Sequence, residues 1–160
     1  MKTSCNIASP DFLLQVERIE ASDAGPCVRH MKYRPCRLLL KDGTVVPRAI
    51  CAEDHRGFDG KWWIHPNAVA RIEMTLERLP AHLASKLYAA GESGMGYQVF
   101  RARMSDGACY TFLTGNVVEF PDFPEGYDTN DVQEVYPHEG REELILRKSH
   151  DFEWCFYVKD

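Results

Sequence analysis

The sequence has no pair of cysteines spaced for chemistry. Its six cysteines are scattered, and no two of them form a CxxC pair. A zinc ribbon or a dithiol redox centre needs such a pair, because two thiolates must reach one metal ion or one another. The histidines likewise show no HxH, HxxxH or HExxH spacing. We therefore expect no metal and no cofactor, and buried, reduced thiols in the strand-like runs that hold Cys36, Cys51 and Cys109.

Long apolar runs are also missing. No stretch approaches the roughly 20 apolar residues that a membrane-spanning helix needs, and residues 1–20 hold no apolar run of about seven, as a secretory signal would. These absences predict a soluble, cytoplasmic protein with no membrane partner. The chain has 160 residues, of which 44% are hydrophobic and 27% charged. That composition is typical of globular proteins, and we expect a single compact domain spanning residues 1–160.

The clearest local signals are those of β-hairpins. Residues 36–50 consist of two apolar runs on either side of Asp42-Gly43, and residues 99–113 have the same form about Asp106-Gly107. An Asp-Gly pair between apolar runs is among the strongest short-range hairpin signals. The sequence therefore predicts two antiparallel hairpins.

Further elements are predicted outside these hairpins. The aromatic and β-branched run at 152–158, with the apolar run at 143–148 before it, predicts a third hairpin at the C-terminal end. Residues 60–65, GKWWIH, predict a short strand. Leucines recur every four residues from 79 to 87, and Pro80 and Gly91 are typical of a helix start and a helix end. Residues 9–20 begin like a helix, although their pattern also permits a strand.

These elements predict an α+β protein that is mostly β. Its antiparallel hairpins would form either one mixed barrel or sheet, or two small SH3-like β-units joined by one helix at about residues 80–90. The second alternative depends on a weak internal duplication with sub-units at 28–78 and 97–160. Three residues of the first hairpin recur 64 positions later in the second: Arg37, Asp42 and Gly43 match Arg101, Asp106 and Gly107.

The glycine-rich stretch GESGMGY, residues 91–97, resembles a phosphate loop only in composition. Phosphate loops follow a strand and open a helix, whereas this stretch follows the predicted helix, at the negative end of its dipole. A nucleophile elbow is excluded because Met95 stands where a glycine is needed. We expect a helix-to-strand connection. The alternative is an anion-binding nest of N–H groups at Gly94, with hydroxyls from Ser93 and Tyr97.

Charge is segregated along the chain. Residues 28–48 hold six basic residues and one acid, whereas residues 119–143 hold nine acids and one arginine. The net charge of −5 disfavours general nucleic-acid binding. The two charged stretches are either solvated or neutralise one another, within one chain or between subunits.

Aromatic residues mark a candidate contact surface. The acidic stretch carries Phe123 and Tyr127 among others, and exposed aromatics beside charge are typical of interfaces. Trp62 and Trp63 would point to opposite faces of a strand, so that one of them could line a groove. The alternative in each case is structural: the rings pin an irregular loop to the body, or pack in the core and across strands.

We expect a binding or regulatory module rather than an enzyme, because no catalytic set passes the tests above. Its partner would be another protein or a second copy of the chain, bound through the aromatic and acidic surface. The alternative is a small hydrolase, or an anion- or ligand-binding protein. Its pocket would lie between the GESGMGY connection and the HEGRE turn, residues 138–142. Ser93, His138 and Arg141 would then converge on one cleft.

Overall fold

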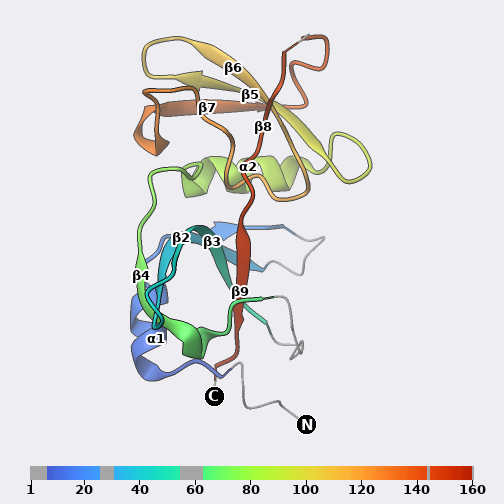
Figure 1. Ribbon diagram of the computed structural model, residues 1–160. Coiled ribbons are helices and arrows are strands. Elements are labelled where there is room, and N and C mark those ends of the chain that lie inside the picture. Colours follow the sequence, from blue (N-terminus) through green and yellow to red (C-terminus); the bar gives the residue numbers. More distant parts are fainter. Residues whose placement is uncertain (1–6, 26–30, 55–62, 144, 160) are drawn as a thin grey trace. The chain divides into compact units, whose positions relative to one another are not determined.

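The computed structural model describes residues 7–25, 31–54, 63–143 and 145–159, and these fall into two compact units (Figure 1). Unit 1 comprises residues 1–21, 31–75 and 152–160, and unit 2 comprises residues 22–30 and 76–151. The described chain is α+β and mostly β, as predicted. The strands form two mixed sheets, and neither closes into a barrel within the described residues, so the barrel form of the prediction is wrong.

Unit 1 is built on a mixed sheet with the strand order β4-β2-β3-β9. The first predicted hairpin is confirmed as β2 and β3, and Gly43 takes the positive φ of 91° that its turn requires. β4 pairs antiparallel with β2, and β9 pairs parallel with β3. The elements of this unit are α1 (Pro10–Val16), β2 (Lys32–Leu40), β3 (Val45–Glu53), the 3-10 turn η3 (Pro66–Ala68), β4 (Val69–Glu73) and β9 (Glu153–Tyr157).

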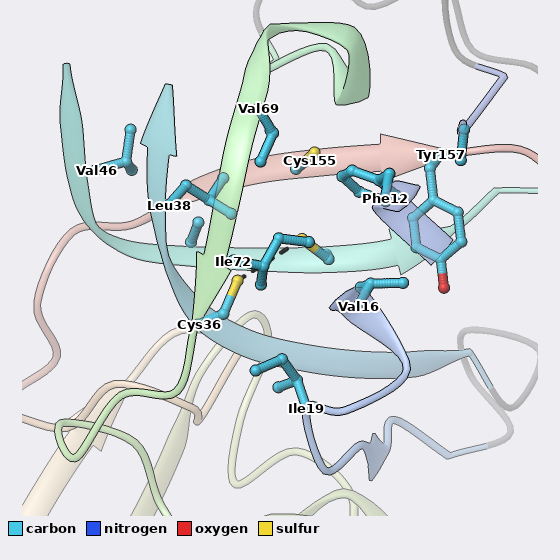
Figure 2. Packing of buried hydrophobic residues seen from close by; sticks show 13 residues of the cluster. Phe12, Val16, Ile19, Cys36, Leu38, Val46, Val69, Ile72, Cys155 and Tyr157 are labelled. Carbon is cyan, nitrogen blue, oxygen red and sulfur yellow. Dashed lines mark hydrogen bonds between the residues drawn. The ribbon is translucent and has the colours of Figure 1, made fainter. Parts of the chain in front are cut away.

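Helix α1 covers the core of unit 1 with its apolar face. Ser9 caps the helix, since its hydroxyl accepts from the Phe12 N–H at 3.1 Å, and Pro10 occupies the first turn. Phe12 and Val16 pack onto buried residues of the sheet (Figure 2). The helical alternative for this segment is thereby confirmed.

Three cysteines meet in the core of unit 1. Cys36, Cys51 and Cys155 are buried, with 3.7 Å between the Sγ atoms of Cys36 and Cys51. Cys51 lies directly opposite Cys155 in the parallel pairing of β3 with β9. The hydrogen bond with the Cys155 thiol, together with burial, raises the pKa of Cys51 well above its ordinary value, against the opposing effect of Cys36. The prediction of a buried thiol is wrong for Cys109, which is exposed near the start of the second hairpin's return strand.

Unit 2 carries a second mixed sheet, with the strand order β7-β5-β6-β8. The second predicted hairpin is confirmed as β5 and β6 about Asp106-Gly107, and the predicted helix as α2. Phe100 and Phe112 face each other across the hairpin and stack at 5.5 Å between ring centroids. The elements are β1 (Ser22–Asp23), α2 (Ala81–Ala90), β5 (Gln98–Met104), β6 (Cys109–Thr114), the 3-10 turn η4 (Thr129–Asp131), β7 (Val132–Pro137) and β8 (Arg147–Lys148).

The predicted C-terminal hairpin is wrong. β8 pairs parallel with β6 in unit 2, whereas β9 pairs parallel with β3 in unit 1. The residues between β8 and β9 do not form a hairpin turn. Among them, the His150 N–H donates to the Phe120 carbonyl at 2.8 Å. The alternation of apolar residues specifies a strand but not its neighbour, so two apolar runs close in sequence need not pair with each other.

The two units repeat one pairing scheme. In each, a helix precedes a hairpin, and the strand after a 3-10 turn pairs back with the first strand of that hairpin. Leu38 faces Ile72 in unit 1, and Ala102 faces Val135 in unit 2. The β2–β4 pairing is irregular between Leu39 and Leu40, and the β5–β7 pairing between Arg103 and Met104, in each case just before the hairpin turn. A parallel strand pairs with the second strand of each hairpin. This correspondence supports the hypothesis of an internal duplication, which stays a prediction about the origin of the chain.

Candidate functional site

The glycine-rich connection in unit 2 is a tight reverse turn between α2 and β5. Gly91 ends the helix with φ 79°, and β5 begins at Gln98. The N–H groups of Ser93 and Gly94 both donate to the Tyr97 carbonyl, at 3.0 and 3.3 Å. The Gly96 N–H donates to the Glu92 carboxylate at 3.3 Å. These N–H groups are therefore engaged within the turn rather than gathered into an anion nest.

The Ser93 side chain ties this turn to the sheet. Its Oγ accepts from the Val99 N–H at 2.8 Å and lies 3.2 Å from the Val99 carbonyl oxygen. The same Oγ lies 2.7 Å from Nδ1 of His138. The main-chain N–H of His138 donates to the Val99 carbonyl at 2.7 Å. Ser93 and His138 therefore meet at the start of β5.

His138 follows β7 in a left-handed backbone conformation with φ 66°, the only positive φ of a non-glycine residue in the described chain. Its Nε2 lies 3.2 Å from the Ala90 carbonyl oxygen. A carbonyl oxygen only accepts, so Nε2 carries the proton that it donates there. In the neutral ring Nδ1 is then an acceptor, and the Ser93 hydroxyl donates to it. The helix end thereby sets the tautomer.

Arg141 joins Ser93 and His138, so the three residues of the hydrolase alternative lie close together. Its guanidinium donates to the Ser93 carbonyl and lies over the Tyr97 ring, 6.0 Å from the centroid. The Tyr97 ring in turn covers Gly94, where an added Cβ would lie 2.4 Å from ring atoms. A glycine is thus required beneath the ring. Five of the predicted binding residues therefore lie close together in the structure: Ser93, Gly94, Tyr97, His138 and Arg141.

An open groove of about 610 Å³ lies beside Arg141 in unit 2. Its apolar walls come from strands β5 and β6, from Tyr97 and from Leu146. Arg141 and Lys148 supply cations, and no carboxylate is among the described residues that line the groove. Within the described residues neither cation forms an ion pair with a carboxylate. The lining residues are Tyr97, Val99, Leu113, Thr114, Gly115, Arg141, Leu146, Lys148 and Ser149.

Sequence reasoning missed the half of this groove that β6 and β8 provide. Leu113 lies on β6, directly opposite Lys148 of β8 in their parallel pairing. No motif marks either residue, and the predicted C-terminal hairpin assigned Lys148 to another neighbour. Only the β6–β8 pairing brings this lysine to the same groove as Arg141.

The aromatic residues of the acidic stretch are used within unit 2. The Tyr127 hydroxyl donates to the Asp106 carboxylate at 2.5 Å, and its ring meets Tyr110 edge to face at 5.5 Å. Phe123 packs edge to face on Phe112 at 6.2 Å. These contacts agree with the structural alternative, in which the rings hold an irregular segment against the hairpin.

The tryptophan pair lies only partly within the described residues. Trp62 lies outside them. Trp63 is half-buried in unit 1 and meets Phe156 edge to face at 4.5 Å. The strand predicted for residues 60–65 is not observed over residues 63–65. Trp63 therefore packs against the Phe156 ring of β9, and it does not belong to a strand itself.

In the described part of the chain no three His, Cys, Asp or Glu side chains gather at a metal-binding distance. Neither helix that the structure describes has the length and apolar character needed to span a membrane. No known protein family, curated protein or solved structure matches the chain.

Proposed function

We propose that unit 2 binds a small anionic molecule with an apolar body, in the groove between the GESGMGY connection and the segment from Arg141 to Ser149. The observation that carries this proposal is the pair of cations, Arg141 and Lys148, on an apolar groove without a carboxylate. The whole chain carries a net charge of −5. Two cations left without acidic partners in such a chain are suited to a ligand's negative group.

The groove accounts for both parts of such a ligand. Its volume of about 610 Å³ falls within the range of small-molecule sites, which are mostly apolar with a few placed polar groups. The walls at Val99, Leu113 and Leu146 would bury the apolar body. The guanidinium fork of Arg141 matches a carboxylate or phosphate, and the Lys148 ammonium adds a point charge.

Ser93 and His138 would act as positioning residues in this function. The Ser93 carbonyl accepts from the Arg141 guanidinium, and its side chain is held by Val99 and His138. This arrangement restrains a long side chain before the ligand arrives, which lowers the entropy cost of binding.

Calorimetric titration and thermal shift with octanoate and phenyl phosphate test the proposal, with octanamide as the neutral probe and inorganic phosphate as the probe without an apolar body. We expect the two amphipathic anions to bind most tightly. Arg141→Gln and Lys148→Gln should each weaken them about tenfold. Lys41→Gln, at an exposed turn of unit 1, is the matched control. Equal affinity for octanamide, or unchanged affinity in both variants, would contradict the proposal.

A second candidate function, ester hydrolysis, is favoured by one observation. Ser93 Oγ, His138 Nδ1, His138 Nε2 and the Ala90 carbonyl form a continuous hydrogen-bonded line, in which His138 has the geometry of a general base. The N–H groups of Ser93 and Gly94 already donate to Tyr97, so they do not supply an oxyanion hole. This candidate therefore ranks second. Hydrolysis of p-nitrophenyl acetate that is lost in Ser93→Ala and His138→Ala would favour it over binding alone.

The protein-binding role of the aromatic and acidic surface remains a separate proposal, with another protein or a second copy as partner and a cytoplasmic location. Its support is the density of acids between residues 119 and 143. Phe123 and Tyr127 are each half-buried, and the ring of each packs against another aromatic ring of unit 2, so that only part of it is available to a partner. Light scattering at low and high salt tests self-association, which should weaken as salt rises if charge drives it.

A further inference from the structure

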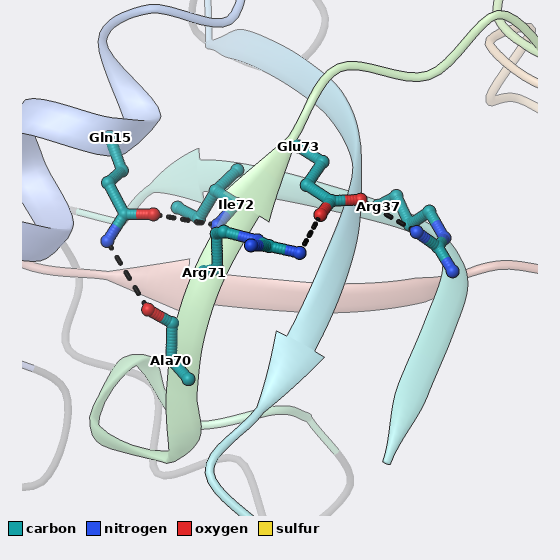
Figure 3. A network of polar contacts seen from close by, with 6 residues as sticks. All are labelled: Gln15, Arg37, Ala70, Arg71, Ile72 and Glu73. Atoms are coloured by element: carbon teal, nitrogen blue, oxygen red, sulfur yellow. Dashed lines mark hydrogen bonds and ion pairs between the residues drawn. The ribbon is translucent and has the colours of Figure 1, made fainter. Parts of the chain in front are cut away.

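The outer edge of β4 in unit 1 is available for main-chain pairing. β4 pairs with β2 on one side, and no described strand pairs with its other side. The backbone groups of Ala70 and Ile72 face that outer side, toward α1 (Figure 3). An edge of this kind is a template on which a further strand can add.

A single side chain, Gln15 of α1, occupies this edge. Its Oε1 accepts from the Ile72 N–H at 2.8 Å, and its Nε2 lies 3.5 Å from the Ala70 carbonyl (Figure 3). The side-chain amide thus presents an acceptor and a donor to β4, as a peptide group of an added strand would. A third contact, from Nε2 to the Asp11 carboxylate at 3.0 Å, steadies it on the helix.

A groove of about 570 Å³ surrounds this amide. One wall is α1 and the segment after it, with Asp11, Arg18 and Ile19, and the other is β4. Met74, the residue that follows β4, is 79% exposed and offers an apolar contact along the same groove. A groove between a helix and an edge strand is suited to an extended peptide, whose backbone pairs with the strand.

The charge of the groove favours an acidic peptide. Arg18 has no carboxylate partner among the described residues. Arg71 pairs with Glu73 at 2.5 Å, yet its side chain is 62% exposed. The acid in the groove, Asp11, already accepts from Gln15. Two exposed cations thus flank the path that a strand would take beside β4.

We propose that the groove between α1 and β4 binds an extended peptide rich in acidic side chains, which adds to the outer edge of β4 and displaces the Gln15 amide. The peptide would take over the bonds to Ile72 and Ala70. In the absence of peptide, the Gln15 amide covers the edge of β4. Its hydrogen bonds to Ile72 and Ala70 must therefore break before the peptide can pair with the strand. The apparent affinity is therefore the intrinsic affinity multiplied by the fraction of molecules in which Gln15 has left the edge.

Unit 2 supplies a matched comparison. The Val135 N–H, at the register position that Ile72 holds in unit 1, pairs with Glu134 Oε1 at 3.0 Å. That carboxylate belongs to the same strand and forms an ion pair with Lys86 of α2 at 2.9 Å. An occupant fixed by its own strand and by a charge is harder to displace than Gln15. Lys86→Ala is therefore a control that alters the corresponding edge of the other unit.

Fluorescence anisotropy of the full chain with a labelled nine-residue peptide of alternating valine and glutamate tests the proposal, with a valine–lysine peptide for comparison. We expect the glutamate peptide to bind more tightly, Gln15→Ala to tighten it about threefold or more, and Arg18→Glu with Arg71→Glu to weaken it about tenfold. Lys86→Ala should change nothing. Gln15→Glu, which places a negative charge beside the acidic peptide and repels it, should weaken binding.

Amide hydrogen exchange identifies the site independently of affinity. The Ile72 amide should exchange more slowly in the peptide complex than in the free protein, and should exchange faster in free Gln15→Ala than in the parent chain. The proposal is overturned if neither peptide binds below millimolar concentration, or if binding leaves the Ile72 amide unprotected. It is also overturned if Gln15→Ala forms a dimer through this edge instead of binding the peptide, because the occupant is then a second copy.

Discussion

Ser93 and His138 are 45 positions apart in the sequence, yet Oγ of the serine lies 2.7 Å from Nδ1 of the histidine. The contact joins the connection after α2 to the segment after β7, within unit 2. It depends on the left-handed backbone of His138 and on the bond from its N–H to Val99. Through the Ser93 carbonyl it also holds Arg141 at the edge of the groove.

Variants of His138 separate its backbone from its side chain. Glycine relieves the positive φ of 66°, whereas alanine keeps the strain, and both lose the bonds to Ser93 and Ala90. We expect His138→Gly to be more stable than His138→Ala by about 1 kcal/mol, measured by urea unfolding. Both variants should lose affinity for octanoate equally. Equal stability of the two would show that the backbone conformation at position 138 relaxes.

Gly140 has a steric requirement as well as a conformational one. Its φ is 99°, and an added Cβ would lie 2.4 Å from the Thr111 Cγ2 atom of the sheet. Gly43 shares the positive φ, at 91°, but an added Cβ there meets nothing within 4 Å. We expect Gly140→Ala to lower the free energy of unfolding by more than about 2 kcal/mol and Gly43→Ala by about 1 kcal/mol. Thr111→Ala in the Gly140→Ala background should recover part of the difference.

Glu119 should make the stability of unit 2 depend on pH. The carboxyl is fully buried and accepts from Ser22 and from the Tyr88 hydroxyl, at 3.2 Å from the latter. Burial raises its pKa from 4.5 to about 7, against the opposing effects of Arg78 and of these two hydrogen bonds. Between these two pH values the folded state holds a proton that the unfolded chain has released.

The free energy of unfolding should therefore fall as pH rises from 4.5 to about 7, by an amount on the order of 3 kcal/mol. Thermal unfolding across this range measures the slope. Glu119→Gln should remove most of the slope, since the amide does not ionise, whereas Glu125→Gln, at an exposed position, should keep it. A slope that persists in Glu119→Gln would assign the proton uptake to another group.

The two hairpin turns should differ in what their aspartates contribute. Asp42 accepts from the Thr44 N–H at 2.8 Å, and Asp106 accepts from the Ala108 N–H at 3.0 Å. Asp106 also accepts from the Tyr127 hydroxyl, which holds the pKa of this carboxyl below its ordinary value of 3.8.

Asp106→Ala should therefore destabilise the chain more than Asp42→Ala at neutral pH. The difference should be lost as pH falls below 3.8 and through the lowered pKa of Asp106, where the carboxyl protonates. Urea unfolding of both variants measures it. In a Tyr127→Phe background the two substitutions should cost the same. A larger cost for Asp106→Ala that survives in this background would show that the Tyr127 bond is not its source.

The sequence predicted a large part of the fold and a smaller part of the candidate site. The Asp-Gly turns and the helix from Pro80 to Gly91 were predictable because each depends on residues that are neighbours along the chain. Ser93 and Arg141 were candidates by composition. Lys148 was not, because its place beside the groove depends on a strand pairing that no local pattern encodes.

By itself, the sequence determined where the hairpin turns lie and where helix α2 begins. A glycine at Gly43 or Gly107 takes a positive φ at little cost, and a proline followed by a leucine repeat starts a helix, whatever surrounds them. Only the tertiary structure decided that β8 and β9 join different sheets, that Ser93 meets His138, and that Gln15 occupies the edge of β4. The free energy of those contacts comes from groups far apart along the chain, so the local preferences of the residues leave them open.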